Sequence, residues 1–102
     1  MRILAIAAMT AVIGACSGSI IKEEMKKLQG QPLSVVVAKL GVPTEEREIA
    51  GNKVYVWFNR TLTEGTELKC QIRVIMKGDV IGSWDFEGNE ARCQRYADLL
   101  RS

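Results

Sequence analysis

The sequence has 102 residues and a net charge of +2, with 14 basic and 12 acidic side chains, three cysteines and no histidine. The basic residues are scattered along the sequence and form no cluster that would bind the phosphates of a nucleic acid. We therefore do not expect nucleic acid as a partner. Without histidine, the usual ligand sets of metal sites and the base of a cysteine nucleophile are missing. We therefore expect no metal, no cofactor, no small-molecule substrate and no enzymatic activity.

Residues 1–15 have the pattern of a secretory signal peptide, in which Arg2 precedes an apolar run that is too short for a membrane span of about 20 residues. The run ends in Ile13-Gly14-Ala15-Cys16, which resembles the lipobox of bacterial lipoproteins. That resemblance implies cleavage before Cys16 and acylation, palmitate included, of the new N-terminal cysteine. In the family this cysteine carries acyl chains on its sulfur and on its amine, and several acyl chains together would anchor the protein stably to a membrane. A plain secreted protein with a chance cysteine is the alternative.

Two short helices are predicted after the signal peptide. Residues 17–19, Ser-Gly-Ser, are expected to form a short tether behind the acylated cysteine. In residues 20–30 apolar side chains recur at helical spacing, and acidic residues precede basic ones, as the helix dipole favours. Residues 33–40 lie between Pro32 and Gly41, which are typical of a helix start and a helix end. These flanking residues outweigh three consecutive valines, which by themselves favour a strand.

From Glu45 the periodicity becomes that of strands. Residues 45–60 predict a strand, a turn at Gly51-Asn52 and a second strand, and residues 61–67 predict a loop. The clearest alternation follows in residues 68–77, where every second residue is apolar. After a turn at Gly78-Asp79, a fourth strand is expected. The side chains predicted to face inward on these last two strands are Leu68, Cys70, Ile72, Val74, Met76, Val80, Gly82, Trp84 and Phe86.

A last helix is predicted after Asn89, which is a typical N-cap residue. Its apolar stripe consists of Cys93, Tyr96, Ala97 and Leu100. The pattern as a whole predicts an α+β fold for a single domain over residues 20–102. Two short N-terminal helices and a C-terminal helix would cover one face of an antiparallel sheet of three to four strands, as a two-layer sandwich.

Cys70 and Cys93 are expected to form one disulfide, because an exported protein folds where thiols oxidise. The rival interpretations are a metal site, which lacks further ligands, and a thiol nucleophile, which lacks an imidazole base. A disulfide that closes a loop of this length stabilises a domain by about 3 kcal/mol. It would join the last helix to an inward-facing strand position.

The stretch LQGQPLSVVVAKLGVPT, residues 28–44, resembles the opening helices of the SmpA/OmlA (BamE-like) family of small outer-membrane lipoprotein domains. The family pattern is matched at Gly30, Val36, Leu40, Gly41 and Pro43. The strand GNKVYVWF, residues 51–58, looks like the family's aromatic strand, and the lipobox agrees. The resemblance covers roughly residues 20–87.

This resemblance implies a non-enzymatic scaffold that binds an envelope protein, with the β-barrel assembly machinery as the family's partner. Ser17 after the anchor cysteine fits the usual rule for outer-membrane sorting, which implies the periplasmic leaflet of a Gram-negative outer membrane. The chain departs from the family in its disulfide and in lacking an obvious match to the family's partner-binding segment after the first strand.

An inhibitor of a periplasmic or secreted hydrolase is the alternative function. The order of helices and strands resembles domains of β-lactamase-inhibitory proteins, and small envelope lipoproteins also include lysozyme inhibitors. The partner recovered from membranes separates the two functions, since one predicts a membrane assembly complex and the other a single soluble hydrolase.

A candidate partner-binding surface comes from residues 54–58, whose two faces are both apolar although one covered face would suffice. If Val54, Val56 and Phe58 pack under the helices, Tyr55 and Trp57 lie on the open face. They are then near Arg73 and Ile75 of a neighbouring strand. Aromatic and arginine side chains are enriched at binding hot spots. In the opposite pleat, Tyr55 and Trp57 belong to the core, and the sequence favours neither arrangement.

Overall fold

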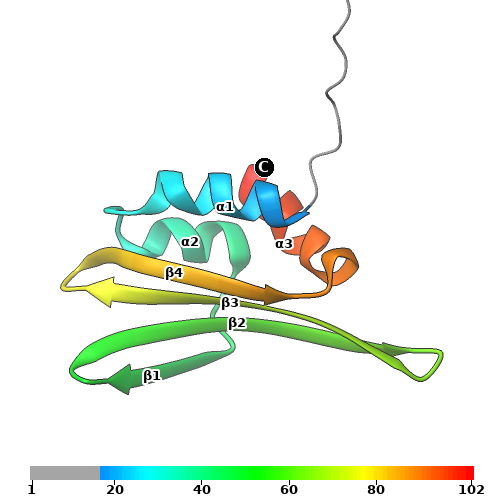
Figure 1. Ribbon diagram of the computed structural model, residues 1–102. Helices are drawn as coiled ribbons and strands as arrows, with labels where there is room; N and C mark the ends of the chain where they lie inside the picture. Colours follow the sequence, from blue (N-terminus) through cyan, green and yellow to red (C-terminus); the bar gives the residue numbers. More distant parts are fainter. Residues whose placement is uncertain (1–16) are drawn as a thin grey trace, which may run out of the picture.

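The computed structural model describes residues 17–102, which form three helices and one four-stranded antiparallel sheet (Figure 1). The elements in chain order are α1 (Ser17–Leu28), α2 (Leu33–Leu40), β1 (Glu45–Ile49), β2 (Asn52–Thr63), β3 (Thr66–Lys77), β4 (Val80–Gly88) and α3 (Glu90–Arg101). The strand order is β1-β2-β3-β4. The predicted α+β class with an antiparallel sheet is confirmed. Cys16 and the signal peptide predicted over residues 1–15 lie outside the described residues.

The three helices lie over the same face of the sheet (Figure 1). α1 begins at Ser17, so the residues expected to form a tether, 17–19, make up the first turn of this helix instead. Ile21 and Met25 of α1 are completely buried. The core between helices and sheet also contains Val36, Ile72, Val74, Ala97 and Leu100. Within residues 17–102, no helix is both long and apolar enough to span a membrane.

α2 forms as predicted in spite of its valines. Gly41 follows it with a φ of 90°, and the Gly41 N–H donates to the carbonyl of Val37 at 2.8 Å. This conformation is one that glycine adopts without steric cost. The loop before α2 is tied to the edge of the sheet, because the Gly30 N–H donates to the Ile81 carbonyl and the Ile81 N–H donates to the Gln31 carbonyl, each at 2.9 Å.

A β-bulge in β4 overturns the predicted inward position of Val80. Ile75 pairs with Ser83 and Met76 pairs with Ile81, so Gly82 has no partner in the register. One extra residue reverses the side-chain alternation. Ile81 is therefore buried at 1% exposure and Val80 is exposed, whereas Trp84 and Phe86, beyond the bulge, face the helices as predicted.

The segment predicted as a loop, residues 61–67, is the end of a long hairpin. β2 and β3 continue to the pair Thr63 and Thr66, and only Glu64 and Gly65 form the turn. Both turn residues have positive φ, 52° and 80°, as in the primed turns of two-residue hairpins. β1 and β4 stop short of this region, so residues 60–69 project as a hairpin arm (Figure 1).

The first hairpin turn also differs from the prediction by one residue. Ala50 and Gly51 occupy the turn, with φ of 53° and 84°, and Asn52 is already the first residue of β2. Alanine is an uncommon choice at positive φ. The prediction placed the turn at Gly51-Asn52, and Ala50 carries no turn signal of its own.

The start of α3 is held against β3. Gly88 has a φ of 145°, and a Cβ there would overlap the backbone of Lys69, so only glycine fits. Asn89 lies at the predicted N-cap position, but its side chain makes no cap hydrogen bond. Its Oδ1 instead accepts from the Lys69 N–H at 2.8 Å, while the Asn89 N–H donates to the Lys69 carbonyl at 2.8 Å. The asparagine thus acts as a strand partner for Lys69.

The predicted disulfide joins Cys70 of β3 to Cys93 of α3, with a Cα–Cα distance of 5.1 Å. The two residues are 0% and 2% exposed. A disulfide buried to this extent is inaccessible to soluble thiols in the folded protein. Its role is therefore structural: it fastens the last helix to a central strand.

Candidate functional site

The pleat of β2 decides which side chains a partner can reach. Opposite residues in the register share a face, and Trp57 pairs with Ile72 of the core. Trp57 is 2% exposed, and its Nε1–H donates to the Gly41 carbonyl at 2.8 Å. Tyr55 packs against the same core. The predicted partner surface that placed Tyr55 and Trp57 on the open face is therefore wrong.

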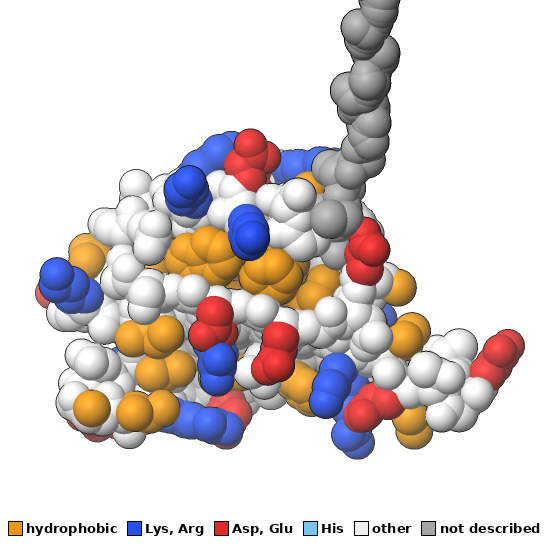
Figure 2. Space-filling view, in the orientation of Figure 1, with side chains coloured by type: hydrophobic (Ala, Val, Ile, Leu, Met, Phe, Trp, Pro, Cys, Tyr) orange, Lys and Arg blue, Asp and Glu red, His pale blue; other side chains and the backbone are white. Residues whose placement is uncertain are grey.

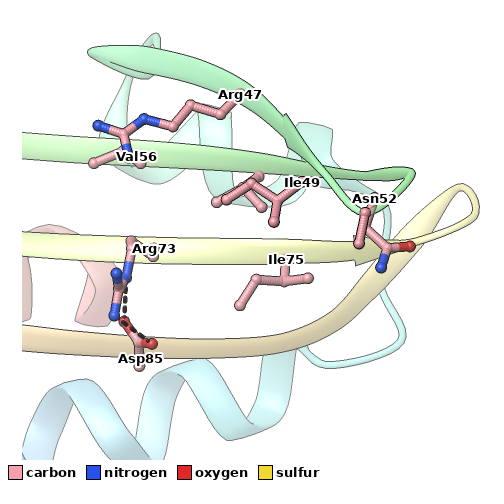
Figure 3. A pocket seen from close by; sticks show the side chains of 9 residues that line it. Arg47, Ile49, Asn52, Val56, Arg73, Ile75 and Asp85 are labelled. Carbon is pink, nitrogen blue, oxygen red and sulfur yellow. Dashed lines mark hydrogen bonds and ion pairs between the residues drawn. The ribbon is translucent and has the colours of Figure 1, made fainter.

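The other two residues of that predicted surface, Arg73 and Ile75, do lie on the open face. They pair with Val56 and Val54 of β2, so the four side chains form one group on the side of the sheet away from the helices. They border a hollow of about 390 Å³, which we call the open-face hollow (Figure 3). Arg47 and Ile49 of β1, Asp85 of β4, and Ala50 and Asn52 at the first hairpin turn also line it.

Val54 and Val56 are 5% and 3% exposed, although all three described helices lie on the other side of the sheet. Long arginine side chains account for this burial, because their methylene stems cover apolar surface while the charged ends stay in water. Arg47 pairs with Val54 in the register. Figure 3 shows Arg47 extended toward Val56 and Arg73 directed toward Asp85. The valines form an apolar floor between two guanidinium groups.

Each arginine is held by an acidic neighbour. Arg73 donates from Nε to Asp85 Oδ1 at 2.8 Å and from Nη2 to Oδ2 at 2.9 Å, and Arg47 lies 2.8 Å from Glu45. The hydrogen bond to Asp85, with its negative charge, raises the pKa of Arg73 above its usual value. These ion pairs are about half exposed, so they contribute at most about 1 kcal/mol each. Their effect is to orient the guanidinium groups.

The chemistry that this arrangement allows is binding. An apolar floor bordered by oriented polar groups suits an apolar side chain of a partner, with hydrogen bonds at its rim. Across residues 17–102, no cluster of three or more metal-ligating cysteine, aspartate or glutamate side chains is found. The buried disulfide keeps Cys70 and Cys93 from acting as ligands or nucleophiles.

The sequence prediction missed Val54, Val56, Arg47 and Ile49 as parts of the site. A usable signal exists in the alternation Arg47-x-Ile49 beside Val54-x-Val56, because the short turn between them places these residues on one face. This alternation shows that the four side chains share one face of the sheet, but it does not show whether the helices cover that face.

No protein-family model, no curated protein and no solved structure matches this chain. The resemblance to the SmpA/OmlA family therefore rests on the sequence alone, in the motifs of residues 28–58 and in the lipobox-like residues 13–16. The open-face hollow is a described surface of the domain that a partner could bind.

Proposed function

We propose that the protein is a non-enzymatic lipoprotein, anchored by acyl chains on Cys16 to the periplasmic leaflet of the outer membrane, that binds an envelope protein and holds it at the membrane. The observation that carries the proposal is the sequence Ile13-Gly14-Ala15-Cys16, which resembles a lipobox and directly precedes α1 in the chain. The open-face hollow supplies the binding surface.

Membership of the SmpA/OmlA (BamE-like) family is part of this proposal and makes the β-barrel assembly machinery the first partner to test. The α+β fold with two helices before the sheet is compatible with the resemblance. The described helices lie over one face of the sheet, and the opposite face is the one that we propose for such a partner.

Replacing Cys16 with serine is expected to abolish lipid labelling and to release the protein from membranes or leave its precursor unprocessed. The physical reason is that acyl chains provide the membrane affinity, and a serine hydroxyl cannot replace the thiol as acyl acceptor. Metabolic labelling with a radioactive fatty acid, followed by membrane fractionation, measures both effects.

Ser17→Ala is the matched control, because it changes the neighbouring hydroxyl residue and keeps the thiol. It should remain labelled and membrane-bound. Normal processing and an unchanged membrane fraction for Cys16→Ser would refute the anchor, and with it the proposed function.

Inhibition of a periplasmic or secreted hydrolase is the second candidate, and the hairpin arm is the observation that favours it. A projecting hairpin has the shape that a concave enzyme cleft accepts. Leu62 near its tip is 71% exposed, and Arg60 pairs with Glu67 across the two strands of the arm at 2.8 Å.

Two exposed aliphatic residues distinguish the surfaces. Ile49 borders the open-face hollow and is 55% exposed, whereas Leu62 lies on the hairpin arm. For the scaffolding function, Ile49→Ser should weaken partner capture and Leu62→Ser should leave it unchanged. Neither substitution should change the free energy of unfolding by more than about 0.5 kcal/mol, because exposed side chains contribute little to stability.

The measurement is affinity capture from solubilised membranes with the acylated protein, followed by identification of the bound proteins. The opposite result, in which Leu62→Ser abolishes capture of a single soluble hydrolase and Ile49→Ser has no effect, would replace the scaffold by the inhibitor. If both variants capture as much partner as the native protein does, neither surface binds it.

A further inference from the structure

An aromatic pair lies at the β4 edge of the sheet. Trp84 and Phe86 are stacked, with ring centroids 6.3 Å apart and an angle of 18° between their planes. Both side chains are partly buried and pack against the core, which leaves part of each ring at the surface. Figure 2 shows hydrophobic side chains exposed along the line where α1 faces β4.

Lysine side chains of α1 lie beside this pair. Lys22 and Lys26 are one helical turn apart, and together with Trp84 they border a shallow hollow of about 360 Å³. Residues at this spacing lie on the same side of a helix. Trp84, Phe86, Lys22 and Lys26 thus form one surface, which we call the aromatic–lysine edge.

The aromatic–lysine edge lies next to the start of the domain. A Cβ placed on Gly18 would be 3.5 Å from Cζ of Phe86, so the first turn of α1 lies against this ring. Gly18 is two residues after Cys16. Two residues span at most about 7 Å, so an acyl chain on Cys16 would have the aromatic pair within its reach.

We propose that the aromatic–lysine edge contacts the lipid bilayer and fixes the orientation of the domain on the membrane. This inference rests on the proposed acylation of Cys16. Tryptophan and other amphipathic aromatic side chains favour the level of the lipid headgroups, and lysines near a membrane are attracted to anionic lipids. The short connection to the anchor holds these side chains at a high local concentration of lipid, so even weak contacts become occupied.

This orientation has a consequence for partner binding. β4 is one edge of the sheet and β1 is the other. When the β4 edge lies on the bilayer, β1 is the strand farthest from it. Ile49 and Arg47 of β1, in the wall of the open-face hollow, then lie far from the lipid and remain accessible to a protein partner.

Tryptophan fluorescence tests the contact, because the described domain contains only Trp57, which is buried, and Trp84, which is partly exposed. The acylated protein is placed in vesicles whose phospholipid acyl chains carry bromine, a short-range quencher, and in matched vesicles without bromine. We expect the native protein to lose fluorescence in the brominated vesicles. Trp84→Phe should remove this loss, since Trp57 lies in the core.

Charge variants test the lysines in phosphatidylcholine vesicles with and without an anionic phospholipid. The double variant Lys22→Gln, Lys26→Gln is expected to show less quenching of Trp84 than the native protein in the anionic vesicles. Lys53→Gln is the control, because Lys53 is the second residue of β2, two strands away from β4, and pairs with Glu46. It should match the native protein.

Flotation of the same vesicles separates the anchor from the contact. If the protein floats with the vesicles and Trp84 is not quenched, the proposed contact is wrong while the anchor stands. If the protein does not float, the anchor fails and the contact that depends on it fails as well. Quenching that persists in Trp84→Phe would also overturn the contact, because it would place Trp57 near the lipid.

Discussion

Replacing Trp57 with alanine is expected to lower the free energy of unfolding by about 3 to 5 kcal/mol, as truncation of a large buried aromatic side chain does. Trp57 is 2% exposed and packs in the core between β2 and the helices. The substitution also removes the donor to the Gly41 carbonyl and leaves that group without its 2.8 Å hydrogen bond. Urea denaturation followed by circular dichroism measures the change.

Two further variants serve as comparisons for the loss of stability in Trp57→Ala. Trp57→Phe keeps most of the apolar volume and loses the hydrogen bond, so its effect should be smaller than that of alanine. Trp84→Ala removes an aromatic ring that is only partly buried, and it should also cost less than Trp57→Ala. An unchanged unfolding midpoint for Trp57→Ala would mean that Trp57 lies on the surface and that the pleat of β2 is reversed.

Removing the disulfide is expected to cost about 2 to 5 kcal/mol, which is a large share of the stability of a small domain. Cys70 and Cys93 are separated by 23 residues in sequence, and their disulfide restricts the unfolded chain. The double variant Cys70→Ala, Cys93→Ala removes the constraint without leaving a reactive thiol in the core. Comparison of its urea midpoint with that of the native protein gives the loss.

Native protein measured with and without a reducing agent is the control. Reduction should shift the native midpoint toward that of the double variant and leave the variant unchanged. Denatured, unreduced protein should show no titratable thiol at Cys70 or Cys93. Two free thiols in protein isolated from the periplasm would contradict the disulfide.

The helices could be predicted from the sequence because their signals are local. Pro32 and Gly41 mark the ends of α2, and the described helix runs from Leu33 to Leu40. The core-facing side of β3 could also be predicted, since Cys70, Ile72 and Val74 alternate with polar residues and all three are fully buried. In these segments each residue's own preference agrees with the environment that the fold provides.

The hairpin arm and the bulge could not be predicted from local signals. Residues 61–67 contain threonines, glutamates and a glycine, which occur in loops and in exposed hairpins alike, and pairing between β2 and β3 decides the outcome. Glycine suits the bulge at residue 82, because a Cβ there would lie 2.9 Å from the Cβ of Lys77. Such a contact exists only once two strands have met.

The sequence by itself determined the α+β class, the disulfide partners and the inward face of β3, because periodicity and residue chemistry specify these directly. The buried face of β2 was decided only by the tertiary structure. Tyr55 and Trp57 alternate with Val54 and Val56, and a strand with two apolar faces has no preferred side of its own. The helices cover the aromatic face, where the Trp57 Nε1–H donates to the Gly41 carbonyl. Val54 and Val56 lie on the other face, beside the arginines of the open-face hollow.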